Sequence, residues 1–241
     1  GRLFDFIHKT LLPHLHALDV DPRTNLPNPV ATPKQRIIGR IMTAVERVRV
    51  DDEANLRDIL DRVHEISIDH IDDTHFFTLS QVYEDLLLKM GEKNSDGGQF
   101  FTPREVIRAM VHTVNPSLGR TVYDPCCGTG GFLAVAYEHM VRKLGNAAAS
   151  TDIERLKHDT FFGREKENLV FPIALANLVL HGIDQPNLWH GNALTRRPTY
   201  AALFRNAPPQ FDVILANPPF GGKEGKDAQK NFPFETSATQ V

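Results

Sequence analysis

Hydrophobic positions in the first part of the chain recur every three or four residues, which is the spacing of one helix face. Phe4, Ile7, Leu11 and Leu15 form the first such stripe, and Pro13 is expected to bend or end that helix. A Pro-rich loop follows, and further stripes predict more helices. Their members are Ile37, Ile41, Ala44, Val45 and Val48, then Leu56, Ile59, Leu60 and Val63, and finally Val82, Leu86 and Leu87. The pattern predicts an all-α helical domain over residues 1–94.

The hydrophobic pattern changes at residues 94–98. From there, short β-type runs alternate with helical stripes, and Thr102 is expected to cap a helix that has Pro103 at its first position. Strands are predicted at residues 121–124, 160–163, 188–190 and 211–216, with helices at 132–143 and 167–180. This alternation predicts an α/β domain over residues 95–241, built on a parallel, doubly wound sheet. Ligands of such sheets bind beyond the carboxyl ends of the strands.

Composition is that of an ordinary globular protein and excludes several classes. The 241 residues are 41% hydrophobic and 24% charged, and no apolar run is long enough to span a membrane. The formal net charge of -3 argues against a chain that mainly coats nucleic acid, although an enzyme could still meet DNA through a local basic surface. The N-terminus lacks the features of a signal peptide, and a cytoplasmic location is expected.

The cysteines and histidines do not indicate a metal site. Cys126 and Cys127 are adjacent, so they are poorly placed for an ordinary disulfide, and neither has a companion at metal-ligand spacing. The 11 histidines form no close pair at such spacing within one catalytic segment either. His181 and His190 are therefore expected to be surface or structural residues.

A Gly-rich turn joins the first predicted strand of the α/β domain to the helix after it. It reads Asp-Pro-Cys-Cys-Gly-Thr-Gly-Gly-Phe over residues 124–132. Glycines here allow a sharp bend and let a ligand approach the backbone closely. Their spacing does not match a dinucleotide-binding fingerprint, and no Lys-Ser/Thr pair follows as in a P-loop. A tight strand-to-helix turn without a ligand is the alternative.

An acidic residue, Glu165, closes the next predicted strand. A carboxylate in this position can accept hydrogen bonds from both hydroxyls of a ribose. Glu165 follows the turn by about forty residues rather than the roughly twenty of a dinucleotide-binding fold, and an insertion at residues 144–151 is expected to account for the excess. Alternatively, Glu165 is a helix-start carboxylate that the helix dipole favours.

The clearest predicted strand runs directly into Asn-Pro-Pro-Phe at residues 217–220. The consecutive prolines restrict the chain and remove two donors, which leaves carbonyls pointing outward. Asn217 offers a neutral carbonyl acceptor, and Phe220 offers a flat apolar face for stacking. This combination suits a planar group that carries an amino substituent. A simple loop is the alternative, although it would rarely need all of these residue types in this order.

Together these motifs resemble one enzyme family. Residues 217–220 are similar to the catalytic motif of DNA methyltransferases that modify exocyclic amino groups, and the turn at 124–132 resembles their S-adenosylmethionine loop. Gly-Gln-Phe-Phe-Thr-Pro at 98–103 resembles the element that closes over the methionine end of that cofactor, which is the gamma order of motifs. Over residues 75–236 the chain looks like the modification (M) subunit of type I restriction–modification systems.

The resemblance implies a role for each matching residue. Those expected to act on the target base are Asn217, Pro218, Pro219 and Phe220. Those expected to bind S-adenosylmethionine are Phe101, Thr102, Pro103, Asp124, Pro125, Gly128, Thr129, Gly130, Glu165, Asn192 and Ala193. Asn192 stands where many relatives have an Asp near the cofactor adenine, so it offers an acceptor oxygen there but no charge.

The resemblance also implies a function: methylation of the exocyclic amino group of adenine in DNA, with the adenine flipped out of the duplex. The implied partners are double-stranded DNA, a DNA-specificity subunit and a restriction subunit. Lys223, Lys226 and Lys230 are either phosphate contacts or part of a solvated loop. A protein-glutamine or RNA amino methyltransferase, or a non-catalytic scaffold with the same fold, stays open as an alternative.

The chain ends at Val241, soon after Phe220. A complete S-adenosylmethionine-dependent methyltransferase sheet of the doubly wound type needs further strands, usually including an antiparallel hairpin. The catalytic domain is therefore expected to be truncated at its C-terminus, within a longer protein.

Overall fold

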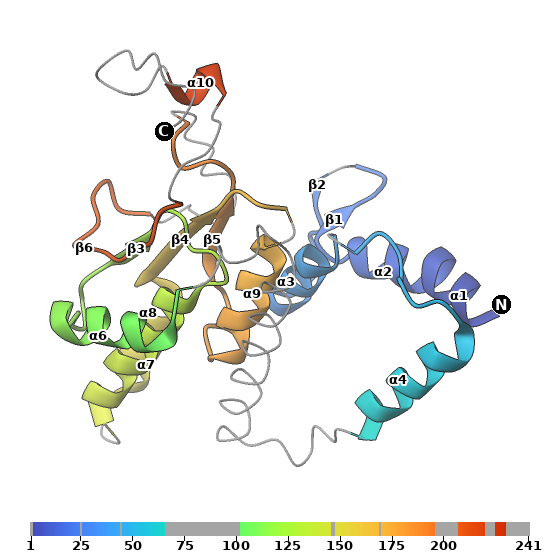
Figure 1. The fold of residues 1–241 in the computed structure, drawn as a ribbon, viewed down its shortest axis with the longest axis horizontal. Coiled ribbons are helices and arrows are strands. Elements are labelled where there is room, and N and C mark those ends of the chain that lie inside the picture. The colour runs from blue at the N-terminus through green and yellow to red at the C-terminus, as the bar shows by residue number, and fades with distance from the viewer. Residues whose placement is uncertain are drawn as a thin grey trace. The chain divides into compact units, whose positions relative to one another are not determined.

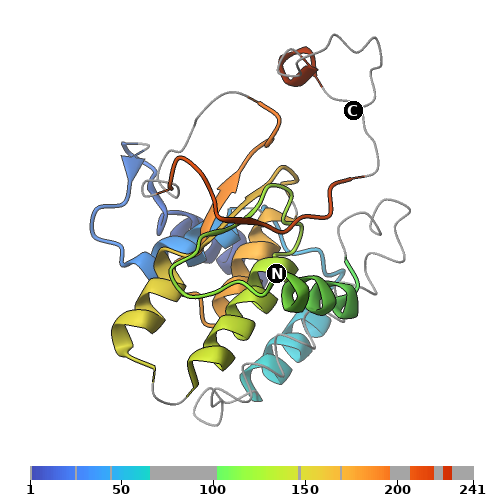
Figure 2. The same ribbon diagram turned by 90° about the vertical axis from the view of Figure 1, so that its left-hand side faces the viewer.

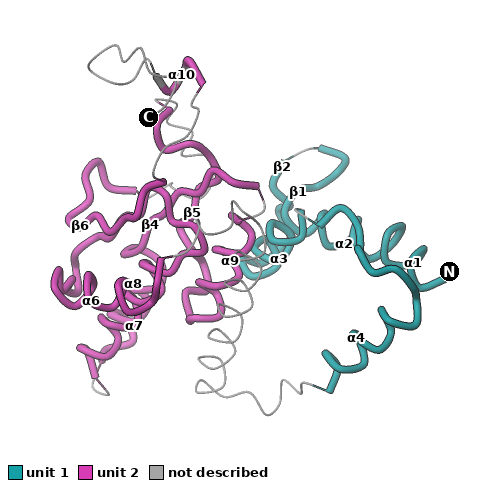
Figure 3. The backbone as a smooth tube through the Cα atoms, in the orientation of Figure 1, with its two compact units in different colours: residues 1–79 teal, residues 80–241 magenta. Residues whose placement is uncertain are grey.

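The computed structural model is shown in Figure 1 and Figure 2. It describes residues 2–24, 26–43, 45–65, 102–145, 148–168, 170–195, 207–219 and 225–229. The chain forms two compact units, Gly1–Leu79 and Ser80–Val241 (Figure 3). The expected domain boundary at residue 94 and the helix expected around Val82 lie outside the described residues. Within the described ranges, no helix is both long enough and apolar enough to cross a membrane.

The first unit opens with a helical stretch that contains a π-helical turn before Pro13. It consists of α1 (Arg2–Phe6), the π-helical turn η1 (Ile7–Leu11) and α2 (Leu12–His16). Pro13 lies in the first turn of α2, where a missing N–H is tolerated, so the helix continues past it. A short hairpin follows in the Pro-rich stretch, where the sequence predicts only a loop. Its strands are β1 (Val20–Asp21) and β2 (Leu26–Pro27).

The other helices of the first unit are shorter or less buried than their hydrophobic pattern predicts. The helix α3 (Pro33–Met42) starts at a capping box and ends before Val45 and Val48, which pack onto the core from the following segment. The helix α4 (Glu53–Glu65) contributes Leu56 to that core, while the rest of its apolar stripe is exposed. The exposed members are Ile59, Leu60 and Val63.

The second unit is built on a parallel sheet of four strands. They are β3 (Val122–Asp124), β4 (Phe161–Glu165), β5 (Asn187–His190) and β6 (Val213–Ile214). Their order is β5-β4-β3-β6, so the chain adds β4 and β5 on one side of β3 and returns to its other side with β6. This topology confirms the predicted doubly wound sheet. The strand order reverses between β3 and β6, which is where ligands of such folds bind.

The helices α7 (Gly131–Leu144) and α9 (Phe171–Leu180) lie on the same side of this sheet (Figure 1, Figure 2). Right-handed crossovers place them so, because β3, β4 and β5 follow one another in a single direction across the sheet. Gly163 in β4 lets α7 approach closely. A Cβ there would lie 2.9 Å from Leu133 of α7 and 2.5 Å from Leu188 of β5.

The helices differ from the sequence prediction in two places. Residues 144–151, expected to be an insertion, lead into a whole helix, α8 (Ser150–His158), which packs against α7 and β4. The helix predicted from residue 167 begins only at Phe171, because Pro172 requires a place in a first turn. The described part of this unit also contains α6 (Arg104–Val114), which packs against α7, and the short α10 (Lys226–Gln229).

The last strand, β6, is shorter than predicted but is held firmly in register. Asp212 accepts hydrogen bonds from the backbone N–H of Thr121 at 2.8 Å and from Arg120 Nη1 at 2.7 Å. These bonds lower the pKa of Asp212 to about 2, the Thr121 N–H having the largest effect. Phe211, at the predicted start of the strand, instead stacks on Tyr123 with ring centroids 4.4 Å apart. The register brings the residues after β6 beside the residues after β3.

Candidate active site

Most of the expected site residues lie at the carboxyl ends of the strands of the sheet. Asp124 is the last residue of β3, Glu165 is the last residue of β4, and Asn217 follows β6. Parallel strands end at a common edge, so these side chains are gathered where the strand order reverses. The structure thus places the Gly-rich turn, the acidic strand end and the Asn-Pro-Pro segment in one region.

The turn after β3 is held by backbone hydrogen bonds. The N–H of Cys126 donates to Asp124 Oδ1 at 3.1 Å, and the N–H of Gly130 donates to the carbonyl of Cys127 at 2.7 Å. Gly130 has φ 83° and caps the N-terminus of α7, a left-handed conformation that favours glycine. Within the turn Pro125 is half-buried, while Gly128, Thr129 and Gly130 are buried.

Glu165 connects β4 to this turn. Its Oε2 accepts the N–H of Gly128 at 2.8 Å, and its Oε1 accepts the N–H of Glu167 at 2.8 Å. Since α9 begins only at Phe171, Glu165 does not stand at a helix start, and the alternative interpretation of its carboxylate is wrong. The Glu165 side chain therefore helps to fix the conformation of the turn.

Both strand-end carboxyl groups are deeply buried. Asp124 is 1% exposed and Glu165 is 6% exposed. Burial raises the pKa of Asp124 to about 7, and the charge of Glu165 adds to that rise. Burial likewise raises the pKa of Glu165. Carboxylates in such surroundings bind donors strongly, so hydroxyl and ammonium groups are the ligand chemistry that this edge favours.

The two cysteines of the turn are unsuited to nucleophilic catalysis. Burial raises the pKa of Cys126 to about 12 and that of Cys127 well above its ordinary value. Both are therefore thiols at neutral pH, and both are free of disulfides. Among the described residues, no group of His, Cys, Asp and Glu side chains could hold a metal ion.

Thr102 contacts the expected catalytic motif directly. Its Oγ1 accepts a hydrogen bond of 3.0 Å from Asn217 Nδ2, although the two residues are 115 positions apart. The sequence prediction that Thr102 caps the following helix is wrong, because Pro103 itself is the cap residue and α6 starts at Arg104. Pro103, Pro218 and Pro219 are exposed, whereas Thr102 and Asn217 are half-buried. Phe101 and Phe220 lie outside the described residues.

Asn192 lies in the loop after β5. Its Oδ1 accepts the N–H of Leu194 at 2.8 Å, which is an Asx turn, and Ala193 between them is half-buried. The N–H of Gly191 donates to the carbonyl of Glu165 at 2.8 Å, so this loop starts beside the end of β4. The oxygen that the sequence assigns to the cofactor is thus also used to shape the loop.

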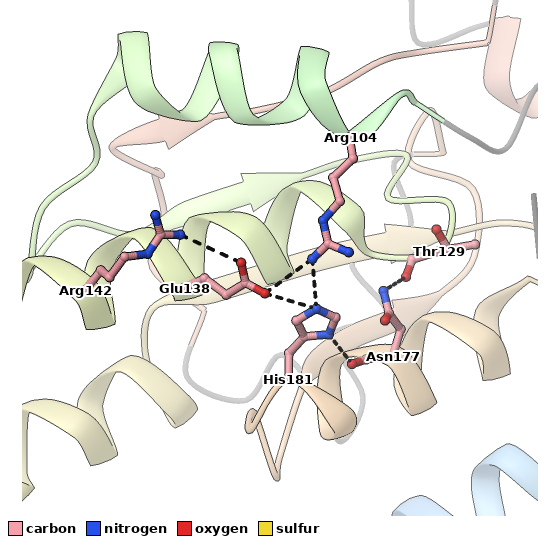
Figure 4. A network of polar contacts seen from close by, with 6 residues as sticks. All are labelled: Arg104, Thr129, Glu138, Arg142, Asn177 and His181. Atoms are coloured by element: carbon pink, nitrogen blue, oxygen red, sulfur yellow. Dashed lines mark hydrogen bonds and ion pairs between the residues drawn. The ribbon is translucent and has the colours of Figure 1, made fainter. Parts of the chain in front are cut away.

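A buried polar network behind the turn was not predicted from the sequence (Figure 4). It includes Asn177 and His181 of the α9 region, Glu138 of α7 and Arg104 of α6. A signal for it does exist in the sequence. Asn177 lies on a helix face made otherwise of apolar residues, and a buried amide needs a hydrogen-bond partner.

Comparisons with known proteins identify relatives of this sequence. A type I restriction enzyme EcoEI methylase subunit from Escherichia coli is 35% identical over 187 residues, which are 77% of this chain and 36% of that protein. The type II restriction enzyme and methyltransferase RM.BcgI from Heyndrickxia coagulans is 30% identical over 167 residues, 69% of this chain and 25% of that protein. The chain thus spans well under half of either relative.

The fold has solved counterparts too. One counterpart is a chain from a structure that concerns the complex assembly and conformational transition of the type I R-M system. It matches with a TM-score of 0.76 and 36% identity, over 99% of this chain and 44% of that chain. The expected resemblance to type I modification subunits is therefore confirmed. The family model described as N-6 DNA Methylase matches residues 75–240, which include both the Gly-rich turn and the Asn-Pro-Pro-Phe motif. This chain belongs to the N-6 DNA methylase family.

Proposed function

We propose that this chain carries the site that methylates the exocyclic amino group of adenine in DNA, with S-adenosylmethionine as the methyl donor. The observation that carries the proposal is the hydrogen bond of 3.0 Å between Asn217 Nδ2 and Thr102 Oγ1. It joins the expected catalytic motif to the expected cofactor element, beside the point where the strand order reverses. Membership of the family supports the use of a methyl donor.

Asn217 and Pro218 are proposed to bind the target amino group. Because the Asn217 amide donates through Nδ2 to Thr102, its Oδ1 is directed away from that contact as an acceptor. The carbonyl of Pro218 is the second acceptor, and an exocyclic amino group has two N–H bonds to donate. Both oxygens would stabilise positive charge that develops on the nitrogen as it gains a methyl group. Phe220 is proposed to stack on the flipped base.

The strand-end carboxylates fit S-adenosylmethionine, which supplies the methyl group when bound. Asp124 and Glu165 are desolvated acceptors at adjacent strand ends, suited to the ammonium and ribose hydroxyl groups of that molecule. Gly128 carries no side chain that would block an approach to the turn, and the absence of a side chain at Gly130 leaves room for Leu178 of α9. Phe101, Thr102 and Pro103 are proposed to cover the methionine end, and Asn192 and Ala193 the adenine.

We infer further that the intact protein acts on duplex DNA in the cytoplasm, together with a DNA-specificity subunit and a restriction subunit. The name of the Escherichia coli relative supports this, since it is a methylase subunit of a type I restriction enzyme. The net charge of -3 supports it too, because a chain in which acidic residues outnumber basic ones needs a partner for much of its grip on DNA phosphates. Lys226 is exposed and is available for such contacts.

The proposal is tested with Asn217→Ala in the intact protein. Transfer of labelled methyl groups to duplex DNA should fall roughly 100-fold or more, because an acceptor of the reacting amino group is removed. Calorimetric titration should show that S-adenosylmethionine still binds with nearly unchanged affinity. Asn55→Ala, at an exposed position in the first unit, serves as the control and should leave both measurements unchanged. Undiminished transfer by Asn217→Ala would refute the assignment.

A further inference from the structure

The polar network of Figure 4 begins at the Gly-rich turn. Asn177 is 0% exposed, and its Nδ2 donates to the carbonyl of Thr129 at 2.8 Å. Thr129 directly precedes Gly130, the left-handed cap of α7. The Asn177 side chain thus holds the backbone of the turn between β3 and α7 in place.

From Asn177 the network continues through the next helical turn. The backbone carbonyl of Asn177 accepts a hydrogen bond of 2.8 Å from Nδ1 of His181. A carbonyl can only accept, so Nδ1 carries the hydrogen and Nε2 faces the other way. There Nε2 lies 3.3 Å from Glu138 Oε1 and 3.5 Å from Arg104 Nη2, and the imidazole is 1% exposed.

The other end of the network lies next to Thr102 and Pro103, which are expected to bind the methionine end of the cofactor. Glu138 Oε1 accepts a hydrogen bond of 3.3 Å from Arg104 Nη2, and the two side chains are 14% and 16% exposed. Arg104 is the first residue of α6 and directly follows Thr102 and Pro103. A continuous chain of contacts therefore leads from the carbonyl of Thr129 to the base of the segment that holds Asn217 through Thr102.

Stability alone does not account for such a network. Apolar side chains of similar volume in place of a buried ionic group are often neutral or stabilising, since desolvation offsets the attraction between the charges. The described part of α9 is otherwise strongly apolar, so the packing of this helix does not itself call for an amide at position 177. What the polar groups add is a defined geometry between the elements that they join.

We propose that Asn177, His181, Glu138 and Arg104 form a polar brace that positions the Gly-rich turn relative to the Thr102–Pro103 segment for binding of S-adenosylmethionine. They are positioning residues, which act through the carbonyl of Thr129 at one end and the backbone after Pro103 at the other. This inference rests on the proposed function, because it assigns the brace to the same cofactor site.

The test separates positioning from stability with Asn177→Leu in the intact protein. The variant keeps the branched shape of the side chain but is larger and removes the donor to the Thr129 carbonyl, so the thermal midpoint should fall by several degrees while the protein stays folded. The Kd and KM for S-adenosylmethionine should rise about tenfold, the loss expected for one buried hydrogen bond. At saturating cofactor, kcat should stay within about twofold of the wild type.

The second part of the test compares two arginines that contact the same carboxylate. Arg104 and Arg142 both contact Glu138, but Arg142 is 3.9 Å away with a side chain 76% exposed, and it does not adjoin the cofactor segment. Arg104→Gln should raise the Kd for S-adenosylmethionine, whereas Arg142→Gln should not. Equal Kd values for these two variants would overturn the brace, as would a folded Asn177→Leu that binds like the wild type. A wild-type protein that binds no S-adenosylmethionine would overturn the proposed function itself.

Discussion

Asp124 shows how a single residue at this site works against the stability of the fold. Its folded-state pKa of about 7 lies above the ordinary 3.8, because burial disfavours the charged form. Between about pH 4 and pH 7 the folded protein therefore holds a proton that the unfolded chain has lost, and the free energy of unfolding falls as the pH rises. A carboxyl group kept in such a place is expected where it has a ligand to bind.

Asp124→Asn should raise the free energy of unfolding at pH 8 by on the order of 1–3 kcal/mol and change it little at pH 4. Urea unfolding at both pH values measures this, and affinity for S-adenosylmethionine should fall in the same variant. Asp212→Asn is the control of opposite sign. The pKa of Asp212 is lowered to about 2, so its stabilisation is present above pH 3.8 and is lost as the pH falls toward 2. Destabilisation of both variants at pH 8 would contradict the role given to Asp124.

The residues that could be predicted are those whose chemistry is written in a local motif. Asp124, Glu165 and Asn217 each end or follow a strand, and parallel strands bring such positions together. The partner of Asn217 could not be predicted this way. The local pattern at Thr102 indicates a helix cap, whereas its hydroxyl contacts a residue 115 positions away. Asn177 was missed for the same reason, since its partner Thr129 lies on another element.

At the scale of elements, alternation of strand and helix patterns was sufficient to predict the sheet. Each strand from β3 to β6 was found from a short β-type run, and the parallel arrangement of β3, β4 and β5 follows from the helices between them. The helix α8 was missed because much of its sequence is polar, with Leu156 its only fully buried residue among those described. β6 begins only at Val213, and Phe211, two residues before it, stacks on Tyr123.

The close packing of α7 on the sheet makes Gly163→Ala a test of this architecture. The new methyl group would press on Leu133 and Leu188, both fully buried, so the free energy of unfolding should fall by about 1–3 kcal/mol. Urea denaturation measures the change. Gly225→Ala is the matched control, because a Cβ there meets nothing within 4 Å. Equal stability of the two variants would show that α7 does not approach β4 as described.

At the scale of the whole molecule, the two compact units differ in whether they contain the proposed site. The first unit has a small core of Ile7, Leu12 and Leu56, whereas the proposed site lies wholly in the second. The chain spans 36% of one relative and 44% of a solved chain of the type I system. The activity proposed for the site is therefore to be measured on the intact protein.

The most direct measurement is to identify the atom that receives the methyl group. The intact protein would be incubated with methyl-labelled S-adenosylmethionine and duplex DNA, with the proposed specificity subunit present, and the DNA then digested to nucleosides. The label is expected in N6-methyladenine and should be lost when Asn217 is replaced by alanine. Label in a methylated cytosine, or transfer to RNA or a glutamine amide instead of DNA, would contradict the proposed function.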